Sequence, residues 1–334
     1  MKTITVVIPT YNEEENIPLV YERVRRLFSA GLSSYEYEIL FIDNHSEDQS
    51  RELILELCRR DPKVRAIFNA KNFGFNRSVF YGLLQGSGDC TVLLFADMQD
   101  PPEVIEEFVR CWEQGFKIVT GIKNKSRENP FLYGVRAAYY RLIRAISDID
   151  HIAQFDGFGL YDKSFIRVLS QLDDSMPYLR GIVAELGYER KDVFYEQQKR
   201  KKGKSSFNFF RLYDVAMLGI TSYSKVVLRL ATISGFFMAA ISFLIGCVTL
   251  VMKLMYWDRF EMGIAAISVG LFFLGSVLLF FIGFQGEYIL NINTRIMKRP
   301  LVIEERRVNF EKTQDGERKE ERKETDAGQK GGKG

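Results

Sequence analysis

The residues best suited to chemistry lie in an acidic segment at positions 95–103, FADMQDPPE. Asp97 and Gln99 directly follow an apolar run, and their side-chain oxygens suit a hard divalent cation such as Mg²⁺ or Mn²⁺. Such an ion could bridge them to a diphosphate and neutralise a leaving group. The alternative is a helix N-terminus, where the macrodipole favours acidic residues. That alternative explains the acidic residues Asp100 and Glu103. It does not explain why an acidic residue, Asp97, stands at the end of an apolar run.

Two other polar clusters follow apolar runs nearer the N-terminus. Positions 9–13 read PTYNE and could face a base and a ribose, or could form only a turn and a helix cap. Positions 43–48 read DNHSED, and the carboxylate of Asp43 could accept hydrogen bonds from a nucleobase or ribose. Ser46 or Asp48 could instead cap the following helix. The residues alone leave both pairs of alternatives open.

The elements that must position these clusters alternate between strands and helices. Short apolar runs predict strands at 4–8, 37–42, 64–68 and 91–95, and amphipathic stretches predict helices at 13–28, at 48–60 and after Pro101 and Pro102. This alternation is typical of βαβ units, so the expected fold is α/β with a mostly parallel, Rossmann-like sheet. Ligands bind such sheets beyond the carboxyl ends of the strands. The three polar clusters are therefore expected to border one crevice.

Long apolar segments change the character of the second half of the chain. Residues 231–252 and 262–286 contain no charged side chain, and each exceeds the roughly 20 residues that cross a bilayer as a helix. The short link at 253–261 predicts a two-helix transmembrane hairpin. Basic residues flank both of its outer ends, which places both chain termini and the preceding domain in the cytoplasm. The expected location is the inner (plasma) membrane, with a multi-pass topology.

A basic run at 199–204, followed by an aromatic amphipathic stretch, precedes the hairpin. The stretch resembles an interfacial helix, and the run could attract a lipid phosphate or serve only as a positive-inside anchor. The chain is therefore divided into four parts. We expect a catalytic domain at 1–198, a juxtamembrane segment at 199–229, the hairpin at 230–287, and a cytosolic tail at 288–334 that is disordered after about residue 309.

Composition excludes several classes of protein. The net charge of +3, from 46 basic and 43 acidic residues, gives no reason to expect a nucleic-acid partner. The four cysteines form no CxxC pair, so neither a zinc site nor a disulfide framework is indicated and a reducing compartment fits. The sequence at the N-terminus shows no signal-peptide pattern.

Taken together in this order and spacing, the motifs resemble glycosyltransferase family 2. They are PTYNE, the acidic loop after the second strand, NFG at 72–74, and DMQDPPE at 97–103. They look most like the branch of dolichol-phosphate mannose synthase and bactoprenol (polyprenyl-phosphate) glucosyltransferase. The likeness covers about residues 3–225 and implies a glycosyltransferase A-type fold and a hexosyltransferase. The hairpin is similar to that of bacterial polyprenyl-phosphate glycosyltransferases.

The resemblance also implies roles for individual residues. The nucleotide sugar, UDP- or GDP-linked, would be bound by Pro9, Tyr11, Glu13, Asp43 and Asp97. Asp97 and Gln99 would hold the metal ion and the diphosphate. Arg180 matches a loop near the sugar and the acceptor, and Asp156 is the expected sugar-contacting or base residue. The acceptor phosphate would be bound by Arg200, Lys202 and Ser205, in a segment that matches RxxGxS.

Three positions depart from the family pattern. Phe95 stands where the family has the first acid of Asp-x-Asp, so only one carboxylate of the metal pair remains and metal dependence is uncertain. Asn44 replaces the second Asp of the loop after the second strand. The segment that usually reads Asp-Thr-Gly-Asp-Phe is QFDGFG at 154–159, in which Asp156 is out of register.

The expected reaction is an inverting transfer of a sugar from a nucleotide-sugar donor to polyprenyl phosphate at the cytosolic face. A phosphate acceptor is already anionic and needs no strong general base, whereas a saccharide hydroxyl would need a carboxylate. Transfer to a saccharide hydroxyl in lipopolysaccharide or capsule assembly therefore stays open. So do a non-catalytic membrane scaffold that binds nucleotide sugar, and a homo-oligomer.

Overall fold

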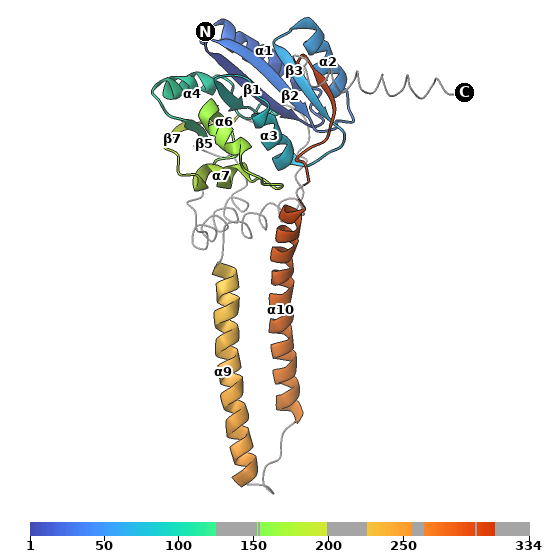
Figure 1. The fold of residues 1–334 in the computed structure, drawn as a ribbon, viewed down its shortest axis with the longest axis vertical. Coiled ribbons are helices and arrows are strands. Elements are labelled where there is room, and N and C mark those ends of the chain that lie inside the picture. Colours follow the sequence, from blue (N-terminus) through green and yellow to red (C-terminus); the bar gives the residue numbers. More distant parts are fainter. Residues whose placement is uncertain (125–151, 153, 199–225, 256–263, 298, 311–334) are drawn as a thin grey trace, which may run out of the picture.

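The computed structural model describes residues 1–124, 152, 154–198, 226–255, 264–297 and 299–310. It contains an α/β domain from which two long helices extend (Figure 1). Arg200, Lys202 and Ser205, which the sequence predicts to bind the acceptor phosphate, lie outside the described residues, as does the chain after residue 310.

An eight-stranded sheet forms the centre of the domain, in the order β7-β5-β6-β4-β1-β2-β3-β8. Its strands are β1 (Thr3–Thr10), β2 (Glu36–Asp43), β3 (Val64–Asn69), β4 (Cys90–Leu93), β5 (Ile118–Lys123), β6 (Gly159–Asp162), β7 (Arg190–Tyr195) and β8 (Glu304–Val308). β4, β1, β2 and β3 are parallel neighbours, as the sequence predicts. The sheet as a whole is mixed, because β6 and β8 run antiparallel to their neighbours, while the other six strands share one direction.

Helices cover both faces of the sheet because successive strand residues point to opposite sides. One core contains Ile4, Val6 and Ile8 of β1, packed with α1 (Ile17–Ser29), α2 (Ser50–Arg60) and α4 (Val104–Glu113). The other contains Val7, packed with α3 (Phe75–Leu84), α6 (Lys163–Ser170) and α7 (Leu179–Glu185). The buried positions of α1 recur at helical spacing, which is why this segment folds as a helix on the sheet.

The predicted apolar segments form the helices α9 (Val226–Met255) and α10 (Ile264–Ile296). Large apolar side chains such as Phe236, Leu254, Leu271 and Leu279 are exposed along them. In the part of the chain that the structure describes, one stretch, Phe273–Thr294 of α10, is long and apolar enough to cross a membrane, and none of it is buried. The two-helix hairpin as a membrane unit therefore stays a proposal.

After α10, the chain returns to the sheet as β8, a strand that the sequence analysis did not anticipate. β8 pairs antiparallel with the edge strand β3, and Val302 just before it is buried. Asn309 donates hydrogen bonds of 2.7 Å to the carbonyl oxygens of both Cys58 and Val64. The stretch assigned to a cytosolic tail thus supplies a strand of the central sheet.

Candidate functional site

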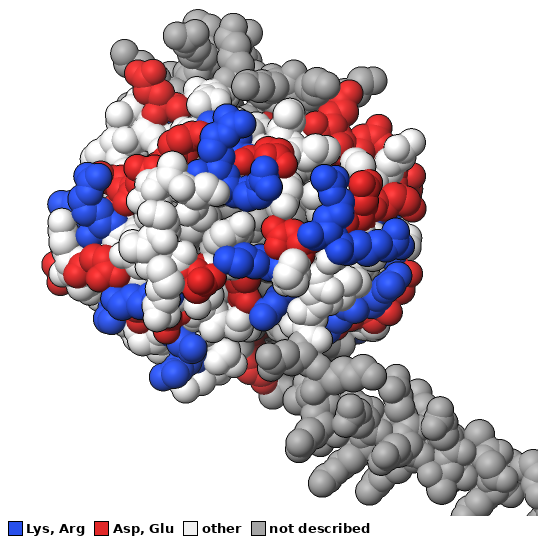
Figure 2. Space-filling view, turned by 90° about the horizontal axis from the view of Figure 1, so that it is seen from above, with Lys and Arg blue, Asp and Glu red and all other residues white. Residues whose placement is uncertain are grey.

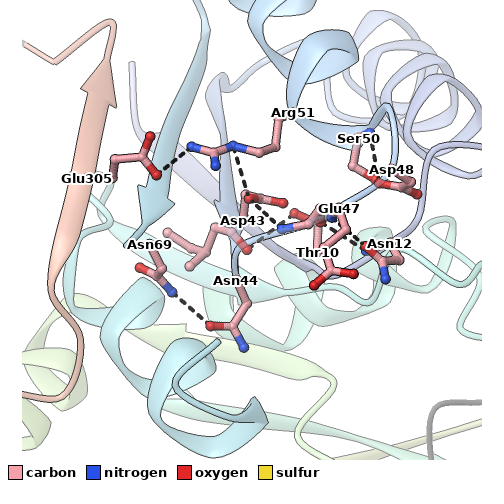
Figure 3. A network of polar contacts seen from close by, with 12 residues as sticks. Thr10, Asn12, Asp43, Asn44, Glu47, Asp48, Ser50, Arg51, Asn69 and Glu305 are labelled. Atoms are coloured by element: carbon pink, nitrogen blue, oxygen red, sulfur yellow. Dashed lines mark hydrogen bonds and ion pairs between the residues drawn. The ribbon is translucent and has the colours of Figure 1, made fainter. Parts of the chain in front are cut away.

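The turns that follow β1 and β2 are bound to each other by backbone-to-side-chain hydrogen bonds (Figure 3). The amide of Asn12 donates to Ser46 Oγ at 2.9 Å, and the amide of Glu47 donates to Asn12 Oδ1 at 2.9 Å. The amide of Glu13 donates to Ser50 Oγ at 2.9 Å. The prediction that these two clusters are neighbours at the carboxyl ends of their strands is therefore confirmed.

Part of this polar cluster is structural. Asp48 accepts from the amide of Ser50 at 3.0 Å and from the amide of Glu14 at 3.1 Å, so its carboxylate stabilises the start of α2. Asn16 Nδ2 donates to the carboxylate of Glu13 at 2.6 Å. Glu13 thus holds its own turn, and its predicted contact with the nucleotide stays a prediction, as does that of the half-buried Pro9 and Tyr11.

Asp43 ends β2 and is fully buried, with an exposed fraction of 0%. Its Oδ2 accepts from the amide of Ser46 at 3.1 Å and lies 3.8 Å from Nε of Arg51. Its Oδ1 has no hydrogen-bond partner among the residues that the structure describes. Burial raises the pKa of Asp43 above its ordinary value, against the opposing effects of the Ser46 hydrogen bonds and the Arg51 charge. A buried acceptor without a partner is costly and suits a ligand that donates a hydrogen bond.

Asn44 has a different task from its neighbour. Its Oδ1 accepts from Asn69 Nδ2 at 3.1 Å and from the amide of Phe73 at 3.0 Å. Its Nδ2 donates to Asn72 Oδ1 at 2.9 Å. An amide can donate and accept at once, which a carboxylate cannot. Asn44, which stands in place of the family acid, therefore fixes the NFG segment against the end of β2.

The acidic segment after β4 lies beside β1, because β4 and β1 are paired neighbours. Asp97 is half-buried, and its Oδ1 accepts from the amide of Gln99 at 3.2 Å. Gln99 is contacted twice by the chain that follows β7. Gln197 Nε2 donates to Gln99 Oε1 at 2.6 Å, and the amide of Gln198 donates to the Gln99 carbonyl at 2.9 Å.

A charged cluster lies directly behind this segment. Asp100 accepts from the hydroxyl of Tyr195 at 2.6 Å, and Lys123 Nζ lies 3.7 Å from its Oδ1. The same Nζ is 2.5 Å from Asp156 Oδ2. Burial and the negative charge of Asp156 raise the pKa of Asp100 to about 7, in opposition to Lys123 and Tyr195. The structure thus brings the predicted Asp156 together with the acidic segment, through a lysine that the sequence analysis missed.

Arg180 is the second residue of α7 and is half-buried. The positive charge of Arg180 and the negative charge of Asp156 both act on the buried hydroxyl of Tyr161, which donates to the Gly157 carbonyl at 2.7 Å. Burial raises the pKa of Tyr161 well above its ordinary value. Arg180 and Asp156 thus belong to the same region. α7 lies at the end of the domain from which α9 and α10 extend (Figure 1).

Phe95 occupies the position of the absent acid and packs its ring against Phe75, with 5.6 Å between the ring centroids. Within the described residues, no group of three or more His, Cys, Asp or Glu side chains is placed to hold a metal ion. Asp97 and Gln99 would therefore bind a cation only together with other ligands. Mg²⁺ commonly binds in this way, through one or two carboxylates, waters and substrate phosphates.

Comparison with known proteins agrees with this arrangement. The model of the family "Glycosyl transferase family 2" matches residues 5–170. The uncharacterized glycosyltransferase YkcC of Bacillus subtilis (strain 168) is 31% identical over 308 residues, which is 92% of this chain and 94% of the relative. The SfII prophage-derived bactoprenol glucosyl transferase of Shigella flexneri is 33% identical over 301 residues, which is 90% of this chain and 96% of the relative.

Among solved structures, mannosyl-3-phosphoglycerate synthase from Rubrobacter xylanophilus has a TM-score of 0.45 and 15% identity, over 70% of this chain and 75% of that one. The family assignment rests on the sequences, because relatives above 30% identity match nearly the whole chain. This chain belongs to glycosyl transferase family 2, and the protein is a glycosyltransferase.

Proposed function

We propose that the protein is a membrane-bound, inverting glycosyltransferase that moves a sugar from a UDP- or GDP-linked donor to polyprenyl phosphate at the cytosolic face of the membrane. The carrying observation is the ion pair between Lys123 and Asp156, which lie 2.5 Å apart. A carboxylate held by an ammonium group in this way is poorly placed to take a proton from a sugar hydroxyl. An acceptor phosphate already carries negative charge and needs no such base.

The donor would lie beyond the carboxyl ends of β1, β2 and β4. The buried Oδ1 of Asp43, which has no hydrogen-bond partner in the described part of the chain, supports the placement of the base or ribose at this residue. The diphosphate would reach Asp97 and Gln99, where Mg²⁺ or Mn²⁺ fits if the diphosphate supplies further oxygen ligands. Such an ion, when bound, would neutralise charge on the departing nucleoside diphosphate.

The transfer itself forms one bond and breaks one. A phosphate oxygen of the acceptor attacks the anomeric carbon from the face opposite the donor diphosphate, and the bond from that carbon to the donor phosphate oxygen breaks. The nucleoside diphosphate leaves with the bonding electrons, and the configuration at the anomeric carbon is inverted. The protein's own part is to orient the two phosphates, with the positive charges of Lys123 and Arg180 in the region of Asp156.

Two observations support a lipid acceptor at a membrane. The Shigella relative is named a bactoprenol glucosyl transferase. The apolar stretch Phe273–Thr294 of α10 is unburied, and α7, which carries Arg180, lies at the end of the domain facing these helices (Figure 1). The same proposal includes a donor linked to UDP or GDP, a multi-pass topology and a homo-oligomer.

An acceptor panel tests this function. We expect the full chain in detergent, supplied with UDP- and GDP-sugars, to release nucleoside diphosphate and form a glycosylated lipid with polyprenyl phosphate. The matched polyprenol without phosphate is expected to turn over on the order of 100-fold or more slowly, because groups that bind the phosphate would be left unpaired. Product mass identifies the sugar. Faster transfer to a saccharide hydroxyl than to the lipid phosphate would contradict the proposal.

A further inference from the structure

Glu305, which follows the two long helices in the sequence, lies at the edge of the sheet near the residue predicted to bind the base. Arg51 of α2 lies between two carboxylates, with Nε 3.8 Å from Asp43 Oδ2 and Nη2 2.8 Å from Glu305 Oε2 (Figure 3). Its guanidinium also lies over the ring of Phe68, 5.2 Å from the centroid. The guanidinium is therefore held at three points, one of which belongs to β8.

The register of β8 explains why Glu305 reaches this place. Arg306 is opposite Phe68 and Glu304 is opposite Asn69, so the pairing shifts at this point and Glu305 is the extra residue. Such irregularities re-aim a side chain and are enriched beside active sites. The carboxylate of Glu304 serves elsewhere, accepting from the hydroxyl of Tyr81 at 2.5 Å and pairing with Arg307.

The charge of Arg51 favours the ionised form of Asp43, alongside the hydrogen bonds from Ser46. Its carboxylate is fully buried, and burial alone disfavours its charged form. Arg51 is the cation paired with it in the described structure, although at 3.8 Å the two groups form no hydrogen bond. The distance between Arg51 and Asp43 can increase easily if the guanidinium loses its partner on the opposite side. That partner is Glu305.

We propose that Glu305 is a positioning residue for the donor: through Arg51 it orients the Asp43 carboxylate that receives the base or ribose. This inference rests on the proposed donor role of Asp43. It also makes the donor site depend on the chain that follows α10. The last turn of α10 is itself fixed to the domain, because Ser175 Oγ donates to the Thr294 carbonyl at 2.9 Å. Only a short link separates that turn from β8.

The test uses the full chain in detergent and the sugar nucleotide that gives product in the acceptor panel, with UDP and GDP titrated separately as binding probes. Glu305→Gln is expected to raise the donor KM, and the Kd of the matching nucleoside diphosphate, by roughly 3- to 10-fold. The kcat and the acceptor KM are expected to change less than about 2-fold. Glu305 contacts neither Asp97 and Gln99, where the diphosphate is proposed to bind, nor α7. Glu305→Asp, which keeps the charge, is expected to recover part of the loss.

Glu304→Gln is the matched control, because it removes a carboxylate from the same strand that contacts Tyr81 and Arg307 instead of Arg51. It is expected to lower thermal stability at least as much as Glu305→Gln while leaving the donor KM unchanged. Equal increases of the donor KM in both variants would mean that β8 acts only through stability, and would overturn the inference.

A double-variant cycle separates the contribution of Asp43 to donor binding from that of Glu305. Asp43→Asn is expected to raise the donor KM more than Glu305→Gln does, and the double variant is expected to be no worse than Asp43→Asn alone. A large effect of Asp43→Asn with none of Glu305→Gln, or with additive losses, rejects the positioning role and leaves the proposed function intact. No effect of Asp43→Asn on donor binding rejects the donor site itself, and the inference with it.

Discussion

Asp97→Asn is expected to lower kcat by on the order of 1,000-fold, because it removes the carboxylate of the proposed cation site. This is the size of effect seen when a preorganised group that stabilises developing charge is lost. The half-buried carboxylate lies in the loop after β4, four residues beyond the end of that strand and outside both hydrophobic cores. Asparagine retains an oxygen that can accept from the Gln99 amide, as Asp97 Oδ1 does at 3.2 Å. The fold should therefore survive, and the loss should appear in turnover. Steady-state kinetics at saturating donor, with thermal unfolding as the check on folding, measures it.

Glu103→Gln is the control in the same segment. Glu103 is exposed, pairs with Arg23 and precedes the first residue of α4, which is the structural role expected of an acid at a helix N-terminus. We expect its replacement to change kcat by less than about 2-fold, because an exposed pair contributes little. Activity of Asp97→Asn within a few-fold of the parent chain would remove the assignment of Asp97 to the diphosphate.

Local sequence patterns predicted the strands and helices of the first half of the domain, where each element is recognisable from its own residues. The four apolar runs and their helices appear as β1 to β4 with α1, α2 and α4, and the first two polar clusters meet as the parallel register requires. Thr10 and Asp43 are register partners at the ends of their strands. Alternation of strands with helices is sufficient to predict this much.

β8 could not be predicted in the same way. Its five residues, EERRV, include four charges and read as part of a solvated tail. Short, charged strands are typical of sheet edges, where they discourage pairing with other chains. The strand forms because β3 offers an open edge and because Asn309 anchors its end to Cys58 and Val64. That information lies in the tertiary structure.

The cluster of Asp100, Lys123 and Asp156 was missed for a related reason. The three residues have no common spacing, and they meet because β6 runs antiparallel between β4 and β5. An apolar strand that ends in a lysine was the one local signal for Lys123, and it resembles an ordinary strand end. The role of Asp156 stays a prediction, although its neighbours are now defined.

Lys123→Met is expected to reduce the free energy of unfolding by on the order of 3 kcal/mol, because removing one partner of a buried ion pair leaves the other charge uncompensated. The Lys123 side chain is 15% exposed, and its ammonium is 2.5 Å from Asp156 and 3.7 Å from Asp100. Asp100 lies in a site where burial and Asp156 already raise its pKa to about 7. Urea unfolding in detergent, with and without the substitution, measures the difference.

Lys117→Met provides the comparison from the residue that precedes the same strand. Lys117 pairs with Asp162 at 3.5 Å, but its side chain is 49% exposed, so the expected loss is below about 1 kcal/mol. Adding Asp156→Asn to Lys123→Met should recover a substantial part of the stability, because it removes the charge left without its partner. Losses of equal size for the two lysines, or no recovery in the double variant, would show that the cluster is well solvated. The carboxylate of Asp156 would then be free to act as a base, and transfer to a saccharide hydroxyl would become the better proposal.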